Sequence, residues 1–195
     1  METELKCQIL TDSNIPVYFL KSLQSVPPGA PVEKILTKFS KFASDYKNNN
    51  YLAVQSVKSV PFLFLSKKTS PSRLISDILQ SAVTSQGIDI QLAVVDSIAD
   101  VVCALAGTSY ITRNQKGDLI TKCCECTSNC EVTGTQGSVS LVETHLIKII
   151  ERINFSNLEV KRKFVDVLPR MTMHTNILRN KNIFDKFLAF LRLVK

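Results

Sequence analysis

Apolar residues recur three and four positions apart along much of this chain, which is the spacing of one face of an α-helix. The first clear stripe, Val32, Ile35, Phe39 and Phe42, predicts a helix within 31–45. A second apolar stretch follows it up to residue 65, so that the two segments predict a helical hairpin over 31–65. Pro61 is expected to kink or end the second helix, because proline has no backbone N–H to donate.

A second hairpin is predicted over 70–107. Ser70 and Pro71 are typical of a helix start, with serine as the cap and proline at the first helical position. Gly87 is expected to end the first helix, and Asp89 is expected to cap the second. The apolar stripes of the two helices are Leu74, Ile75, Ile78, Leu79, Ala82 and Val83, then Leu92, Val95, Ile98, Val102 and Leu105.

A third hairpin is predicted over 138–172. Its two helices each begin with the spacing of a capping box, Ser140 with Glu143 and Ser156 with Glu159. A terminal helix over 183–195 is apolar around most of its circumference. An apolar helix at the end of an array indicates a longer array, or a surface that a partner covers.

Short segments of the chain repeat at related spacings. AVQSVKSV, which begins at Ala53, aligns without gaps with VVDSIADV, which begins at Val94, at an offset of 41. A third copy, FVDVLPRM, begins at Phe164, at an offset of 70 from the second. Without the stretch 108–137, rich in Thr, Gly, Asn, Ser and Cys, that offset falls to about 40, the period of two-helix repeats of the HEAT or armadillo type.

The expected fold is therefore all-α: a HEAT/armadillo-like α-solenoid of about three helical hairpins with flanking helices. We expect residues 1–195 to form a single helical-repeat array and to be a fragment of a longer solenoid. The stretch 108–137 is expected to be a disordered loop that contains the cysteines. The chain has only six glycines, which argues against a turn-rich β-sandwich.

The net charge of +7 is concentrated at the end of the chain. Residues 161–195 contain nine Lys or Arg and two Asp, so they carry the whole excess. Such a segment is a solvated helix face, a surface for phosphate groups or a surface for an acidic partner. The sequence has neither a secretory signal nor an apolar run long enough to span a membrane, so we expect a cytosolic or nuclear protein without a membrane partner.

The sequence contains no nucleotide-binding loop, dinucleotide fingerprint or His-Glu-x-x-His zinc motif. His145 and His174 lie on different predicted helices without the third partner of a catalytic triad, so each is interpreted as structural or exposed. We therefore expect no catalytic residue, no cofactor and no small-molecule substrate.

One cysteine cluster is the candidate metal site: Cys123, Cys124, Cys126 and Cys130. These residues could supply four thiolates to zinc, but structural zinc sites usually separate two pairs of ligands by a dozen or more residues. A mobile loop of reduced cysteines is the favoured interpretation. Selective oxidation of the cluster is the remaining alternative.

Two segments carry a resemblance to a known family. SVPFLFLSKKTSPSRL, from Ser59, and LIKIIERINFSNLEVKRKFVDVLPRM, from Leu146, resemble the N-terminal helical-repeat region of ATR-type checkpoint kinases, which belong to the phosphatidylinositol-kinase-like protein kinases. The resemblance covers about residues 52–171. It implies a nuclear serine/threonine kinase of the DNA-damage and replication-stress response, whose kinase domain lies far downstream and whose catalytic residues are not present here.

By the same resemblance, this region would be a scaffold that binds a regulatory subunit of the kinase and assists recruitment to single-stranded DNA coated by its binding protein. The leading hypothesis is thus a non-catalytic scaffold for protein partners. The alternative is a basic helical domain that binds nucleic acid directly through residues 161–195. The affinity of such a domain would fall steeply with salt.

Overall fold

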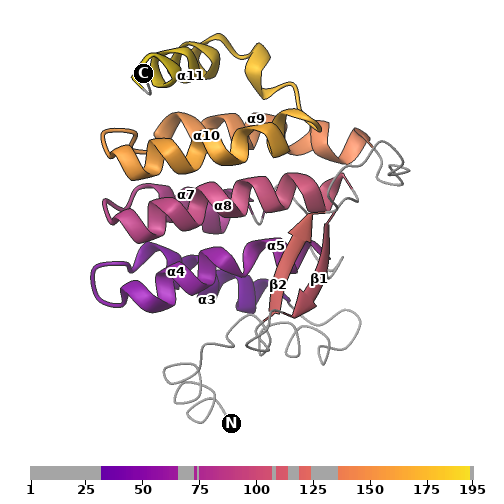
Figure 1. Cartoon of the computed structure of the whole chain (residues 1–195). Coiled ribbons are helices and arrows are strands. Elements are labelled where there is room, and N and C mark those ends of the chain that lie inside the picture. The colour runs from indigo at the N-terminus through magenta and orange to yellow at the C-terminus, as the bar shows by residue number, and fades with distance from the viewer. Residues whose placement is uncertain are drawn as a thin grey trace.

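The computed structural model of the chain describes residues 32–65, 73, 75–106, 109–113, 119–123 and 136–193. Its helices are stacked in successive layers (Figure 1). The expected start of the second hairpin at Ser70-Pro71 lies outside the described residues. The helical elements are α3 (Val32–Ser44), α4 (Asn50–Lys58), α5 (Val60–Leu65), the π-helix η1 (Ile75–Leu79), α7 (Gln80–Val83), α8 (Ile88–Leu105), α9 (Gln136–Arg152), α10 (Leu158–Thr172), the 3-10 helix η2 (Ile177–Arg179) and α11 (Lys181–Leu193).

The described chain is mostly helical, as the sequence predicted. Helices α3, α4 and α5 form the first layer, and η1, α7 and α8 form the second. The third layer contains α9 and α10, and α11 lies at the far end of the stack (Figure 1). Contacts join α4 to α8 and α8 to α10, so each layer packs directly on the next.

The break between α4 and α5 confirms the effect expected of Pro61. Helix α4 ends at Lys58, and the N–H of Ser59 donates to the carbonyls of Gln55 (3.0 Å) and Ser56 (3.3 Å). The Ser59 hydroxyl donates to the Gln55 carbonyl as well (2.7 Å). Pro61 then stands in the first turn of α5, where a missing N–H costs no intrahelical hydrogen bond.

The stretch 108–137 is not the uniformly disordered loop that the sequence predicted. It contains β1 (Ser109–Arg113) and β2 (Leu119–Cys123), which pair antiparallel with Ser109 opposite Cys123. This ribbon contacts α8. The other described elements are helices, so the mostly helical structure is consistent with the expected all-α class. The loop prediction relied on composition and overlooked two short runs of β-branched and aromatic residues, which favour strands.

The third layer starts differently from the prediction at both helices. Helix α9 begins at Gln136, so Ser140 lies inside the helix instead of capping it. The cap of α10 is Asn157, whose side-chain oxygen accepts from the N–H groups of Glu159 (2.8 Å) and Val160 (3.3 Å). Asparagine caps a helix as well as serine does. For α10, the capping-box spacing therefore placed the cap one residue too early.

The start of α8 is also corrected by the structure. Gly87 caps α8 instead of ending the preceding helix, and Asp89 is the second residue of α8. The Tyr46 hydroxyl donates to Oδ1 of Asp89. A Cβ atom on residue 87 would lie 2.1 Å from the Tyr46 ring, so only glycine fits beneath that tyrosine without a shift.

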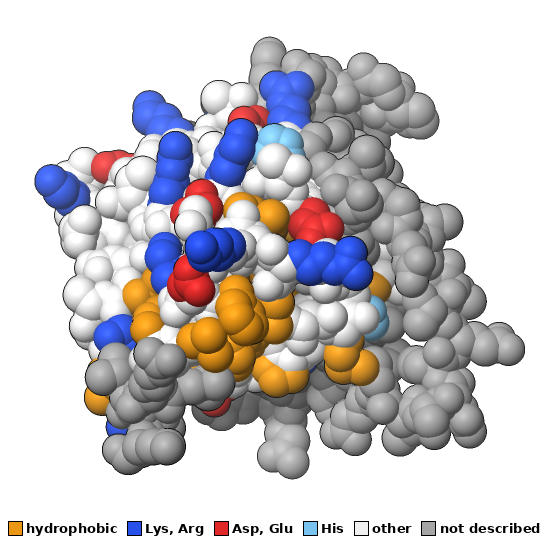
Figure 2. Space-filling model, turned by 90° about the horizontal axis from the view of Figure 1, so that it is seen from above, with side chains coloured by type: hydrophobic (Ala, Val, Ile, Leu, Met, Phe, Trp, Pro, Cys, Tyr) orange, Lys and Arg blue, Asp and Glu red, His pale blue; other side chains and the backbone are white. Residues whose placement is uncertain are grey.

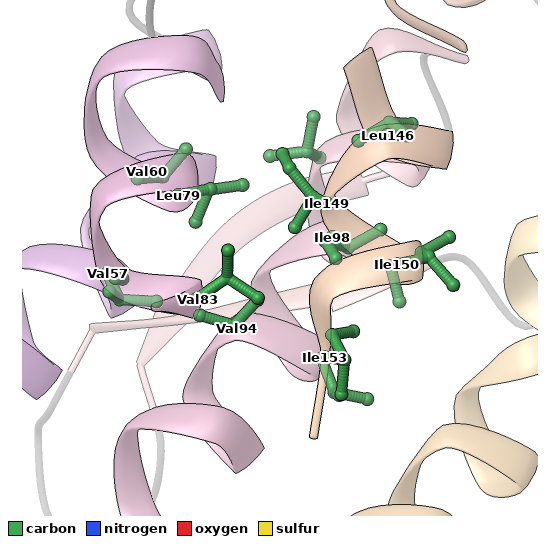
Figure 3. Close-up of a cluster of buried hydrophobic side chains, with 14 of the residues drawn as sticks. Val57, Val60, Leu79, Val83, Val94, Ile98, Leu146, Ile149, Ile150 and Ile153 are labelled. Carbon is green, nitrogen blue, oxygen red and sulfur yellow. The ribbon is translucent and has the colours of Figure 1, made fainter. Parts of the chain in front are cut away.

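The layers share one hydrophobic core. Figure 3 shows Val57 of α4, Leu79 of η1, Ile98 of α8 and Ile149 of α9 in the same cluster, and all four are at most 1% exposed. Burial of one such side chain contributes roughly 1.5–3 kcal/mol. The core therefore joins the hairpins into a single unit.

Candidate functional site: the face formed by α4, α8 and α10

Side chains join successive layers at the spacings of the sequence repeat. The Ser97 hydroxyl on α8 donates to the Val57 carbonyl on α4 (3.0 Å), 40 positions earlier. Ser40 of α3 and Ser81 of α7, 41 positions apart, lie with their hydroxyl oxygens 3.2 Å from each other. Contacts between residues about 40 positions apart therefore join the first layer to the second.

The second and third layers are joined by ion pairs between α8 and α10. Lys163 Nζ lies 2.9 Å from Asp96 Oδ1, and Arg170 Nη2 donates to Asp100 Oδ1, 70 positions earlier. Burial lowers the pKa of Arg170, but its hydrogen bond to Asp100 and the attraction of Asp100 and Cys103 outweigh burial and leave the pKa above its ordinary value. Arg170 is thus held as a cation against α8.

The first turn of each of the helices α4, α8 and α10 contains an exposed apolar residue. Tyr51 is the second residue of α4 (39% exposed), Ile88 is the first of α8 (44%) and Leu158 is the first of α10 (51%). Ile88 and Leu158 stand 70 positions apart, which is the repeat offset. These three residues, which we call the edge residues, line the starts of α4, α8 and α10 in the stack (Figure 1). Apolar side chains exposed at the starts of these three helices are suited to contact with another protein.

Gln91 is a buried polar residue that sequence analysis missed. It is 2% exposed, and its Nε2 donates to the carbonyls of Val83 (2.9 Å) and Ser85 (2.6 Å). Its Oε1 accepts from the N–H of Asn154 in the turn between α9 and α10 (3.2 Å). Gln91 therefore connects the turns of the second and third layers. A polar residue one position before the apolar stripe of α8 was the only signal for it in the sequence.

The two histidines have different surroundings in the structure. Nδ1 of His145 on α9 lies 3.1 Å from the Ser76 hydroxyl on η1, and no described residue supplies a third hydrogen-bonded group to this pair. His174 lies after the end of α10, and burial lowers its pKa. A serine–histidine pair without an orienting third group lacks the arrangement that nucleophilic catalysis uses.

The candidate zinc ligands fall mostly outside the described residues. Cys123 is the last residue of β2, whereas Cys124, Cys126 and Cys130 lie in the part that is not described. Within the described ranges, no group of three or more His, Cys, Asp or Glu could hold a metal ion. The zinc site and its alternatives therefore stay predictions.

Several cations of the basic segment are engaged within the protein. Besides the ion pairs of Lys163 and Arg170, Lys186 Nζ donates to the Glu151 carbonyl (3.1 Å). Lys161 Nζ stands 5.5 Å from the centre of the Phe190 ring. These contacts favour a role for the charge in holding the third layer and α11 together. The exposed cations in this segment, where side chains are described, are Arg162, Arg179 and Lys181.

In the part of the chain that the structure describes, no helix is both long and apolar enough to cross a lipid bilayer. Comparison of the chain with protein-family models, with curated proteins and with solved structures found no match.

Proposed function

We propose that the chain is a non-catalytic scaffold of the HEAT/armadillo type, which binds protein partners along its stacked helices. The observation that carries this proposal is the register of the layers. Hydrogen bonds and ion pairs connect residues 40, 41 and 70 positions apart, at the spacings of the sequence repeat. In a solenoid each repeat contacts its neighbours in this way, and the stack offers an extended surface for partners.

The proposal also includes the family relationship that the sequence resemblance implies. The scaffold would be part of the helical-repeat region of an ATR-type checkpoint kinase, would act in the nucleus and would bind the kinase's regulatory subunit. Recruitment to single-stranded DNA would then be indirect. Support comes from the mostly helical layers over 52–171, the range of the resemblance, and from the edge residues on α4, α8 and α10.

Calorimetric titration of the purified chain with the regulatory subunit of an ATR-type kinase tests the proposal. We expect saturable binding that Leu158→Ser weakens, because this residue is 51% exposed and contributes apolar contact area. Thr144→Ser on α9 is the matched control, since Thr144 is also exposed but belongs to the first helix of its layer. Absence of binding, or equal effects of the two substitutions, would overturn the proposed partner or the proposed face.

A salt titration with duplex DNA separates this function from direct nucleic-acid binding. If the basic segment bound phosphates, log affinity would fall with log salt at a slope of about 0.9 per phosphate contact. We expect weak binding with a shallow slope, because four cations of the segment already have partners within the protein. Tight binding with a steep slope would replace the scaffold with the nucleic-acid alternative.

A further inference from the structure

The third layer exposes positions whose counterparts in the second layer are buried. On α8, Val95 is 1% exposed, and Ala99 and Cys103 are fully buried. Their counterparts, 70 positions later, are Val165 and Pro169 on α10 and Met173, the residue that follows the end of α10. Val165 is half-buried, Pro169 is exposed and Met173 is 59% exposed. Within the described ranges, these three positions are thus less covered than their counterparts on α8.

Helix α11 covers only part of this end of the stack. Asn182 donates to the Glu151 carboxylate on α9 (3.3 Å), and Phe190 packs on Phe164 of α10 with ring centres 6.4 Å apart. Phe184 and Leu188, one helical turn apart, lie on another side of α11. Phe184 is 41% exposed and Leu188 is half-buried.

These apolar residues stand exposed or half-buried on the two helices at the end of the stack and in the turn after α10. We define the end face as Val165 and Pro169 of α10, Met173 just after it, and Phe184 and Leu188 of α11. Figure 2, which looks onto this end of the molecule, shows apolar side chains grouped between cations and carboxylates. An apolar surface with a charged border is typical of an interaction site.

A carboxylate near the end face indicates what charge a helix bound there would carry. Asp166 is the counterpart of Asp96, which pairs with Lys163 in the next layer (2.9 Å). Asp166 is exposed and forms no ion pair with the described residues. A helix that occupied the next position in the stack would bring its own lysine or arginine to Asp166, as α10 brings Lys163 to Asp96.

We propose that the end face binds an amphipathic helix of a partner protein, with an apolar stripe over Met173, Phe184 and Leu188 and a basic residue opposite Asp166. This inference deepens the scaffold function proposed above, on which it rests, by naming the chemistry of one partner. A second copy of the chain fits less well. On its α11 the exposed Asp185 directly follows Phe184, so docking this helix would bring Asp185 toward Asp166. Two carboxylates at that position would repel each other.

The chain itself contains a suitable probe. A synthetic peptide of residues 157–173 reproduces the helix that occupies this position one layer below, including Lys163. We expect the labelled peptide to bind the whole chain saturably in a fluorescence-anisotropy titration. Because an isolated helix of this length is only marginally formed in water, the informative quantity is the change in affinity between variants.

Reversal of charge on either side provides the decisive comparison. Asp166→Lys in the chain, or Lys163→Glu in the peptide, should each weaken binding about fivefold, and the two changes together should restore much of the loss. Phe184→Ser should also weaken binding, because it removes apolar contact. Glu143→Lys, the same charge change on α9, should leave the affinity unchanged. Equal thermal unfolding of all chain variants would show that each remains folded.

The proposal is overturned if the peptide does not bind saturably, or if Asp166→Lys and Glu143→Lys have the same effect. A dimer of the chain that Asp166→Lys dissociates, detected by sedimentation velocity, would assign the end face to a second copy and overturn the partner helix. The scaffold function is tested separately by the regulatory subunit and Leu158→Ser. Loss of peptide binding with intact subunit binding would therefore reject the end face alone.

Discussion

Gln91 offers the sharpest test of how the layers are held together. Gln91→Leu keeps a side chain of similar size but removes the two donors to Val83 and Ser85 and the acceptor for Asn154. A buried group that loses its hydrogen-bond partner costs roughly 1–3 kcal/mol, while a typical hydrogen bond contributes about 1 kcal/mol net. Since three bonds are lost at a site that is 2% exposed, we expect the free energy of unfolding to fall by about 2–4 kcal/mol.

Urea unfolding followed by far-ultraviolet circular dichroism measures this loss, because the signal reports the helices and the chain contains no tryptophan. The slope with denaturant should stay unchanged, so that the midpoint alone moves. Gln55→Leu on α4 is the matched control: this glutamine is half-buried and takes no part in the network. We expect it to change stability by less than about 0.5 kcal/mol, as most surface substitutions do.

Gln91→Glu adds a test that depends on pH. An ionised carboxylate would face the carbonyl oxygens of Val83 and Ser85, so the folded state should favour its protonated form and raise its pKa above the unfolded value of about 4.3. The unfolded chain then loses its proton first, and the variant's stability declines as pH rises from about 4.3 through the folded pKa, by about 1.4 kcal/mol per unit. The deficit of Gln91→Leu should not vary with pH. A Gln91→Leu variant within about 0.5 kcal/mol of the parent, or a Gln91→Glu variant without pH dependence, would refute the reasoning.

Four further predictions follow from single sites. Ile98→Asp should abolish the cooperative transition, because an unpaired charge at a position 1% exposed costs several kcal/mol out of the 5–15 kcal/mol typical of a domain; circular dichroism should show the loss of helix. Gly87→Ala should lower the melting temperature, since its Cβ would displace the Tyr46 ring, and Tyr46→Ala should relieve that clash in the double variant. His174→Gln should reduce the acid sensitivity of unfolding, because burial lowers the pKa of His174 and the unfolded state takes up the proton first as pH falls below about 6.5. Cys124→Ser should leave the melting temperature within about 2 °C of the parent, and a larger fall with loss of bound zinc would establish the metal site instead.

Local signals placed the helices well but chose the wrong residue at their ends. The apolar stripe of α10 and its start near residue 157 were evident, because helical periodicity is a property of neighbouring residues. The choice of Asn157 over Ser156 as the cap was not, since both residues can accept the same backbone N–H groups. The ribbon of β1 and β2 was missed for a related reason. Two strands of five residues carry little periodicity, and their pairing is decided by contact with each other and with α8.

The candidate surface was predictable in its spacing and unpredictable in its contacts. The offset of 70 aligned Arg170 with Asp100 in the sequence, but only the structure brings their side chains together. The interpretation of 161–195 as a basic surface counted charges without knowing that Lys163 and Lys186 already have partners. Charge is additive along a chain, whereas its availability depends on what lies beside each side chain after folding.

By itself, the sequence determined that the chain is mostly helical and where most of the helices lie, because a stripe of apolar residues follows from the pitch of one helix. Only the tertiary structure decided that Gln91 reaches Asn154, that Gly87 lies under Tyr46 and that Met173 is 59% exposed while Cys103 is buried. Those outcomes depend on contacts between residues far apart in the chain, and such contacts exist only once the layers have stacked.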